Sequence, residues 1–127
     1  MNSQQNIAIL GSGNIGLSLA KGLVKAGICK PQQIMLTRRN VSALTSQADE
    51  GYYVTDNNLK AVKRADIVVL AVLPQQLNKL LDEISPAIKS EKQLLVSVVS
   101  GVSCADIRQQ LDMNVQVIRA MPKSWAI

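Results

Sequence analysis

Three glycines that follow a short apolar run constrain this chain more than any other feature. Residues 7 to 10 are apolar, and Gly11, Gly13 and Gly16 come next with the spacing G-x-G-x-x-G. Glycine lets a strand turn sharply at the first position, lets the backbone approach a pyrophosphate at the second, and lets a helix pack closely at the third. The pattern therefore favours a dinucleotide-binding turn, which consists of Gly11, Ser12, Gly13, Asn14, Ile15 and Gly16.

The segment after the turn has the periodicity of a helix. Ile15, Leu19, Leu23 and Ala26 recur at intervals of three or four residues, which predicts that they share one helix face. Gly27 is placed to end the helix, because glycine readily adopts the left-handed conformation found just past helix C-termini. Glycine-rich turns also occur for purely structural reasons. A strand before the glycines and a helix after them are nevertheless the context that a nucleotide site requires, with the helix N-terminus facing the phosphates.

The end of the second predicted strand, residues 34 to 37, indicates which dinucleotide fits. NAD sites usually place a carboxylate there to bind the ribose 2′-hydroxyl, whereas a 2′-phosphate needs cations or hydroxyls. Here Thr37 is followed by Arg38 and Arg39, and no acid is present. A guanidinium can hold two phosphate oxygens at once, so the sequence predicts NADP(H) in preference to NAD(H). Two solvated arginines in a loop are the alternative interpretation.

The composition limits the chemistry that side chains can supply. Of the 127 residues, 47% are hydrophobic but only 2% are aromatic, so the core must be aliphatic. There is no histidine, the commonest general acid or base and a frequent metal ligand. Cys29 and Cys104 have no cysteine or histidine close in sequence, and we expect neither a metal site nor a disulfide framework. The sequence accordingly predicts no catalytic residue and no metal ligand.

Charge and hydropathy bear on the partners and the location of the chain. The formal net charge is +5, but the basic residues are dispersed and aromatic stacking residues are nearly absent, which argues against nucleic acid. The N-terminal residues carry no secretory signal. The longest apolar run, residues 67 to 73, is too short to span a bilayer. We expect a cytoplasmic protein with no membrane partner.

Apolar runs alternate with helical patterns along the whole chain. This alternation predicts an α/β fold with a doubly wound, Rossmann-like parallel sheet in a single domain, residues 1 to 127. The later strands are predicted at residues 51–55, 67–73, 94–98 and 115–120. The later helices are predicted at residues 41–48, 75–84 and 103–111, and a brief helix that runs through Arg64 is predicted after a turn or cap at residues 56–58. Ser103 and Asp106 resemble a capping box at the start of the last helix.

With these elements placed, the chain resembles the nucleotide-binding half of the pyrroline-5-carboxylate reductase family. The resemblance rests on the glycine turn and on residues 71–75, 96–102 and 119–122, the last of which reads Arg-Ala-Met-Pro. Each segment follows a predicted strand, at the edge where open α/β sheets bind ligands. The resemblance implies that Asn58 lies near the cofactor ribose. It also implies that the nicotinamide lies between two groups of residues, Ala71, Val72, Leu73 and Pro74 on one side and Ser97 to Gly101, including Ser100, on the other.

Two departures from the family pattern affect the nicotinamide and substrate edge. Leu73 stands where the family usually has lysine, and Lys123-Ser124-Trp125 follows Met-Pro where the family has Asn-Thr. The family also has a helical second domain that forms the dimer and contacts the imino-acid substrate, and that domain is not in this sequence. The resemblance thus implies NADPH-dependent reduction of 1-pyrroline-5-carboxylate to proline. We expect the chain alone to bind cofactor without turnover.

Two other functions fit the same sequence. The chain could be a stand-alone NADP-binding module that senses redox state or docks to a partner protein or a second copy, with the apolar residues 125 to 127 as a contact. It could instead be half of another reductase, such as a deazaflavin-dependent NADP oxidoreductase, although the Arg-Ala-Met-Pro segment argues against this. For both alternatives, we expect an imino-acid substrate to bind only when the second domain is present.

Overall fold

One six-stranded parallel sheet forms the centre of the molecule. The computed structural model describes residues 5 to 120 of the chain, and the predicted Met121-Pro122 segment and the C-terminal apolar residues lie outside this range. The strand order is β3-β2-β1-β4-β5-β6, and every neighbouring pair is parallel. This order confirms the doubly wound α/β fold. The strands are β1 (Ile7–Leu10), β2 (Ile34–Thr37), β3 (Tyr53–Thr55), β4 (Ile67–Leu70), β5 (Leu94–Ser97) and β6 (Gln116–Arg119).

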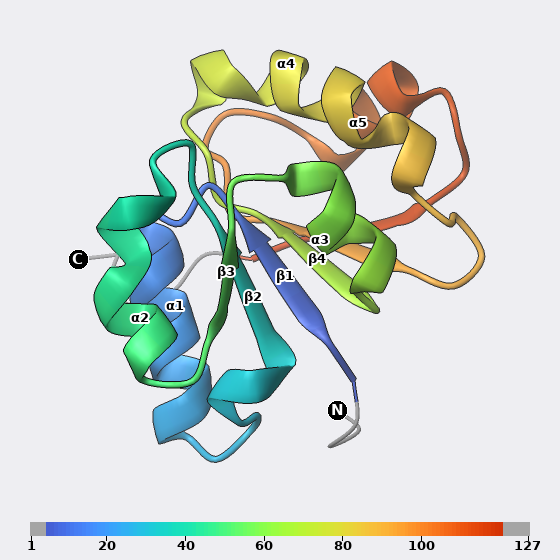
Figure 1. Cartoon of the computed structure of the whole chain (residues 1–127). Helices are drawn as coiled ribbons and strands as arrows, with labels where there is room; N and C mark the ends of the chain where they lie inside the picture. Colours follow the sequence, from blue (N-terminus) through green and yellow to red (C-terminus); the bar gives the residue numbers. More distant parts are fainter. Residues whose placement is uncertain (1–4, 121–127) are drawn as a thin grey trace.

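Helices cover the two faces of the sheet in two groups (Figure 1). The first group lies over β1 to β3, and the second packs on the opposite face. The first group is α1 (Asn14–Lys25) and α2 (Thr45–Asp49), and the second is α3 (Asn58–Arg64), α4 (Pro74–Ile84) and α5 (Cys104–Leu111). Short 3-10 helices cover Pro31–Gln33, Val41–Leu44 and Ser85–Ala87. None of the described helices is long and apolar enough to cross a membrane.

Three predicted helix ends are confirmed, whereas the helix predicted at 41–48 is a 3-10 helix at Val41–Leu44 followed by α2. The Asn57 side chain accepts a hydrogen bond from the N–H of Lys60 at 3.1 Å and starts α3. Ser103 accepts one from the N–H of Asp106 at 3.0 Å and starts α5. Gly27 has a φ of +75° just past α1, where its N–H and the next one bind carbonyls of the last helical turn. Side-chain oxygens and one glycine therefore fix where these helices begin and end.

The structure differs from the sequence-based expectation in two details. Ile15 and Ala26 are exposed rather than part of the buried face of α1, which is formed by Gly16 and Ala20 with flanking half-buried leucines. The reason is that α1 lies so close to β1 that only small residues fit at its centre. The predicted strand at 67–73 ends at Leu70, because the chain leaves the sheet there to reach Pro74, the first residue of α4.

Candidate cofactor site

The candidate site lies at the carboxyl ends of the strands, where the turn between β1 and α1 meets the end of β2. Gly11 has a φ of +81°, a left-handed conformation that side chains rarely adopt. Its N–H donates to Oγ1 of Thr37 at 3.2 Å, and the N–H of Ser12 donates to the Thr37 carbonyl at 2.7 Å. The last residue of β2 thus holds the glycine turn in place.

The three glycines of the turn differ in what an added side chain would meet. A Cβ on Gly11 would collide with Cγ1 of Val72 and lie 3.1 Å from the carbonyl oxygen of Ala71. A Cβ on Gly16 would lie 3.1 Å from Cγ2 of Ile9, so this glycine allows α1 to pack on β1. A Cβ on Gly13 would meet no atom of the chain within 4 Å. The space beside Gly13 is therefore open to a ligand, as the sequence predicts for the second glycine.

The first turn of α1 presents free backbone donors next to this open space. The first bond of the helix runs from the N–H of Leu17 to the Gly13 carbonyl, at 2.9 Å. The N–H groups of Asn14, Ile15 and Gly16 precede that bond and have no partner within the helix. The first turn carries no acidic residue. Both features suit an anion, because the helix dipole is positive at this end.

Ser12 and Thr37 lie beneath the turn rather than on its surface. Ser12 is fully buried, and its hydroxyl donates to the Ile9 carbonyl at 3.0 Å. Thr37 is 1% exposed, and both of its oxygens accept hydrogen bonds from the turn. The structure therefore places these two predicted site residues as supports of the glycine turn.

Arg38 and Arg39 are exposed directly after β2, beside the glycine turn. The N–H of Arg38 donates to the Thr55 carbonyl at 3.2 Å, which fixes the start of this loop against β3. Two exposed polar residues of the same loop, Asn40 and Ser42, were not among the predicted site residues. The Ser42 hydroxyl donates to Oδ1 of Asn40 at 2.6 Å. Their position just after the two arginines was the feature of the sequence that could have indicated them.

The segments after β4 and β5 reach the same edge. Ala71 is buried and its N–H donates to the Leu10 carbonyl at 3.0 Å, which brings Val72 against Gly11. Leu73 is 52% exposed and Pro74 begins α4, so this proline does start a helix. Ser100 is exposed after β5. The structure thus assembles the glycine turn and residues 71–74 into one surface, with Ser100 at the same edge.

Asn58 is oriented differently from the other predicted site residues. Its Nδ2 lies 3.3 and 3.4 Å from the two carboxylate oxygens of Glu83 on α4. Its Oδ1 is buried and has no hydrogen-bond partner among the described residues. Asn58 is the first residue of α3, close behind β3, but its amide binds α4. A contact between Asn58 and a ribose stays a prediction.

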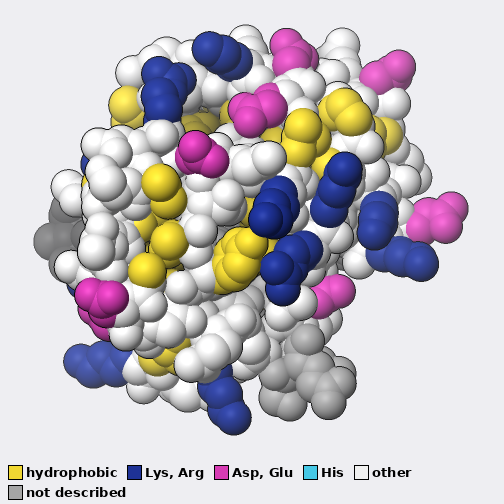
Figure 2. Space-filling model, viewed as in Figure 1, with side chains coloured by type: hydrophobic (Ala, Val, Ile, Leu, Met, Phe, Trp, Pro, Cys, Tyr) yellow, Lys and Arg dark blue, Asp and Glu magenta, His cyan; other side chains and the backbone are white. Residues whose placement is uncertain are grey.

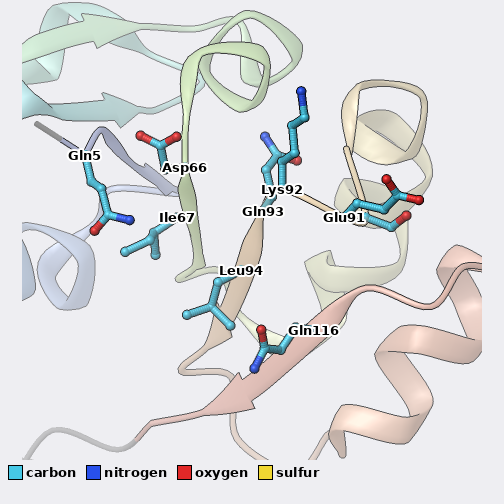
Figure 3. Close-up of a pocket in the computed structure, with 9 residues that line it drawn as sticks. Gln5, Asp66, Ile67, Glu91, Lys92, Gln93, Leu94 and Gln116 are labelled. Atoms are coloured by element: carbon cyan, nitrogen blue, oxygen red, sulfur yellow. The ribbon is translucent and has the colours of Figure 1, made fainter. Parts of the chain in front are cut away.

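A depression of about 450 Å³ lies at the opposite edge of the sheet (Figure 3). It is lined by residues at the amino ends of β4, β5 and β6, among them Asp66, Lys92 and Gln116. No predicted cofactor residue lines it. Among residues 5 to 120, no three His, Cys, Asp or Glu side chains are grouped so as to hold a metal ion.

Comparison with known proteins identifies the family of the chain. The sequence profile of the family described as "NADP oxidoreductase coenzyme F420-dependent" matches residues 6–101, from β1 to the loop after β5. The chain belongs to this family. Its relatives include pyrroline-5-carboxylate reductase 1 of Dictyostelium discoideum, 46% identical over 118 residues, which are 93% of this chain and 21% of the relative. The reductase of Pseudomonas aeruginosa is 35% identical over 126 residues, 98% of this chain and 45% of the relative.

Solved structures show the same relationship for this NADP oxidoreductase family member. A pyrroline-5-carboxylate reductase from Coxiella burnetii superposes with a TM-score of 0.87 at 30% identity, over 94% of this chain and 44% of that one. The Plasmodium falciparum enzyme with NADP bound superposes with a TM-score of 0.79 at 21% identity and supports the fold. The resemblance to the nucleotide-binding half of pyrroline-5-carboxylate reductases is confirmed, and the chain spans less than half the length of these relatives.

Proposed function

We propose that this chain binds NADP(H) at the carboxyl edge of its sheet, as the nucleotide-binding part of a pyrroline-5-carboxylate reductase. The observation that carries the proposal is the open space beside Gly13, next to the free N–H groups of α1. That arrangement fits a pyrophosphate, which needs close backbone approach and hydrogen-bond donors. The match to NADP oxidoreductases and the NADP bound in the Plasmodium relative support the same cofactor.

Arg38 and Arg39 account for a preference for NADP(H) over NAD(H). They are exposed at the end of β2, the position from which a side chain reaches the 2′ group of the ribose. A carboxylate there would bind the 2′-hydroxyl of NAD(H), and this chain has none between Thr37 and Ala48. A guanidinium instead attracts the 2′-phosphate and binds it with two parallel hydrogen bonds.

The chain's own residues bind and orient the cofactor. Bound NADPH supplies a hydride, here to the carbon of the C=N bond of 1-pyrroline-5-carboxylate, which gives proline. The turn and α1 fix the pyrophosphate, while Ala71 to Pro74 and Ser100 border the space left for the nicotinamide. The chain has no histidine and no evident acid pair to donate the imine proton, so we assign that proton to water, to the substrate or to the second domain that the family resemblance implies. We therefore expect binding without turnover.

Calorimetric titration of the 127-residue chain with NADPH and NADH tests cofactor binding. We expect NADPH to bind more tightly, and Arg38→Ala to lower NADPH affinity by about ten-fold or more while changing NADH affinity little. Lys92→Ala, an exposed cation at the opposite edge, is the control and should behave as the parent. Absence of binding of either nucleotide, or an equal loss for both in Arg38→Ala, would contradict the proposal.

A turnover assay separates the domain from a complete enzyme. Incubation of the 127-residue chain with NADPH and 1-pyrroline-5-carboxylate should leave both unchanged, since these residues span less than half of the length of the relatives. Proline formation by the chain alone would show that the active site is complete. The proposal that the chain binds cofactor without turnover would then be wrong.

A further inference from the structure

One contact between α3 and α4 joins an amide to a carboxylate. Asn58 is the first residue of α3, and Glu83 lies close to the end of α4. The Nδ2 of Asn58 lies 3.3 and 3.4 Å from the two carboxylate oxygens of Glu83. An ionised carboxylate only accepts hydrogen bonds, so Glu83 can bind the nitrogen of the amide but not its oxygen. The contact therefore fixes which way the Asn58 amide faces.

The oxygen of the same amide has no hydrogen-bond partner in the described part of the chain. Oδ1 of Asn58 is the one buried side-chain nitrogen or oxygen among residues 5 to 120 to which no group of those residues is bonded. A buried acceptor without a donor carries a desolvation penalty, and native structures rarely leave one. This atom therefore indicates a donor that does not come from these residues.

Helix formation does not account for either residue of the contact. The side chain of Asn57, not that of Asn58, caps α3. Glu83 lies in the last turn of α4, where the helix dipole disfavours a carboxylate and no basic residue accompanies it. Residues that go against the local preferences of their element are expected at functional sites.

The cationic side chains of α3 have a different partner. Figure 2 shows lysine and arginine side chains gathered over this region. Lys60 Nζ lies 6.0 Å from the centre of the Tyr53 ring, and the Arg64 guanidinium lies 4.8 Å from it. These cations thus gather at an aromatic ring, whereas the Glu83 carboxylate contacts the neutral amide of Asn58.

Asn58 lies at the edge of the sheet that carries the candidate cofactor site. It comes shortly after Thr55, the last residue of β3, and α3 then packs on β1 and β2. The glycine turn and the two arginines follow those strands at the same edge. A dinucleotide bound there brings the hydroxyl groups of its ribose rings, and a hydroxyl is a donor that an amide oxygen accepts.

We propose that Glu83 is a positioning residue for the cofactor: its carboxylate holds Nδ2 of Asn58, so that Oδ1 accepts a hydrogen bond from a ribose hydroxyl that NADPH and NADH share. This role rests on the proposed cofactor binding. The ribose supplies the donor that Oδ1 lacks, and the side chains that cover Oδ1 move apart to admit it. Without Glu83 the amide rotates freely, and the cofactor must order it on binding.

Calorimetric titration of the 127-residue chain with NADPH and NADH tests the role of Glu83. Glu83→Ala should lower the affinity for both nucleotides by about five-fold, because the hydrogen bond from the ribose loses its oriented acceptor. Loss of a negative charge would by itself raise the affinity for an anionic cofactor, so the sign of the change separates the two effects. Asp82→Ala, which removes the neighbouring exposed carboxylate of α4, is the matched control and should not lower the affinity.

Two further substitutions at the same position test the hydrogen bond itself. Glu83→Gln keeps an oxygen that accepts from Nδ2 and should bind both nucleotides as the parent does. Glu83→Lys has no acceptor and should lose affinity in spite of its added positive charge. Lysine suits the last turn of a helix, so this variant decides the matter if Glu83→Ala does not fold.

A double-mutant cycle shows whether Glu83 acts through Asn58. Asn58→Ala should lower the affinity at least as much as Glu83→Ala does, and Glu83→Ala should then have no further effect. Circular dichroism checks the fold of each variant. An unchanged or raised affinity in Glu83→Ala, or the same loss with and without Asn58, would overturn the role of Glu83 while the parent still binds cofactor. A parent chain that binds neither nucleotide would overturn the proposed function as well.

Discussion

Gly11 and Gly13 lie two residues apart in one turn, yet the chain constrains only the first. Gly11 combines a φ of +81° with contacts to Val72 and Ala71, so an added methyl group is both strained and blocked. Gly13 has a φ of −81° and open space, so the fold itself does not require glycine there. In the proposed site, it is the bound pyrophosphate that requires glycine at position 13.

Alanine substitutions at these positions separate folding from binding. Gly11→Ala should lower the free energy of unfolding by about 1–3 kcal/mol, because it adds left-handed strain and a steric conflict. Gly13→Ala should leave stability nearly unchanged and weaken NADPH binding strongly, since the methyl group would occupy the space of the pyrophosphate. Denaturant titration and calorimetry measure the two effects. A Gly13→Ala chain with normal NADPH affinity would remove the main support of the proposed site.

The two adjacent tyrosines have opposite environments. Burial raises the pKa of Tyr52, and the charge of Glu50 adds to this effect. A hydrogen bond to Lys60, together with the nearby positive charge of Lys60 and Arg64, lowers the pKa of Tyr53. These shifts leave stability unchanged at neutral pH, where both rings are protonated in the folded and unfolded chain. In alkali, the lowered pKa of Tyr53 favours the folded state and the raised pKa of Tyr52 favours the unfolded state.

Phenolate absorbance during an alkaline titration should therefore rise in two steps. Tyr53→Phe should remove the step at lower pH, and Tyr52→Phe the one at higher pH, because these are the only tyrosines. Lys60→Met should move the first step upward by removing its hydrogen bond and its positive charge. A single step that loses half its amplitude in either variant would contradict the assigned environments.

At the scale of elements, short polar side chains set the start of two helices. The Ser103 hydroxyl accepts a hydrogen bond from the first turn of α5, an eight-residue helix that packs on β6 and α4. Short helices depend on their caps, since few internal bonds offset the cost of ordering them. Ser103→Ala should destabilise the chain by about 1 kcal/mol, as denaturant titration can show, whereas Ser103→Asp should retain the cap. Equal stability of the two variants would show that the cap contributes little.

The sequence predicted the elements well because their signals are local. Each of these signals involves residues close together in the sequence. They are the alternating apolar runs, Gly27 just past α1, and the side-chain caps at Asn57 and Ser103. The errors arose where packing between elements decides. The buried face of α1 consists of small residues because Gly16 lies on Ile9, and no periodicity of large apolar residues shows that.

The site was predicted in part for the same reason. Glycine spacing indicated the turn, but only the structure shows that the Ser12 and Thr37 side chains lie beneath it. The amide of Asn58 binds Glu83, which is 25 residues away in sequence, and no local pattern could reveal that contact. The spacing of residues in a sequence does not distinguish those that would contact a ligand from those that support the turn. Only the three-dimensional structure separates the two roles.

At the scale of the whole molecule, a buried side chain with three hydrogen bonds lies at the edge of the sheet opposite the proposed binding site. Gln93 is 5% exposed at the amino edge. Its Nε2 donates to the carbonyls of Val62 and Ala65 at 2.7 and 2.9 Å, and its Oε1 accepts from the N–H of Lys89 at 2.7 Å. One side chain thus ties the end of α3 to the start of β5. Buried backbone groups that lose such partners carry a desolvation penalty.

Gln93→Leu should therefore lower the free energy of unfolding by about 2–4 kcal/mol, because three buried backbone groups lose their hydrogen bonds. NADPH affinity of the folded fraction should not change, since the substitution lies across the sheet from the glycine turn. Gln109→Leu, on the exposed side of α5, is the control and should leave stability nearly unchanged. Denaturant titration and calorimetry report the two quantities on the same samples. If affinity fell while the chain remained folded, the two edges would be coupled through the parallel sheet, and binding could not be assigned to the carboxyl edge alone.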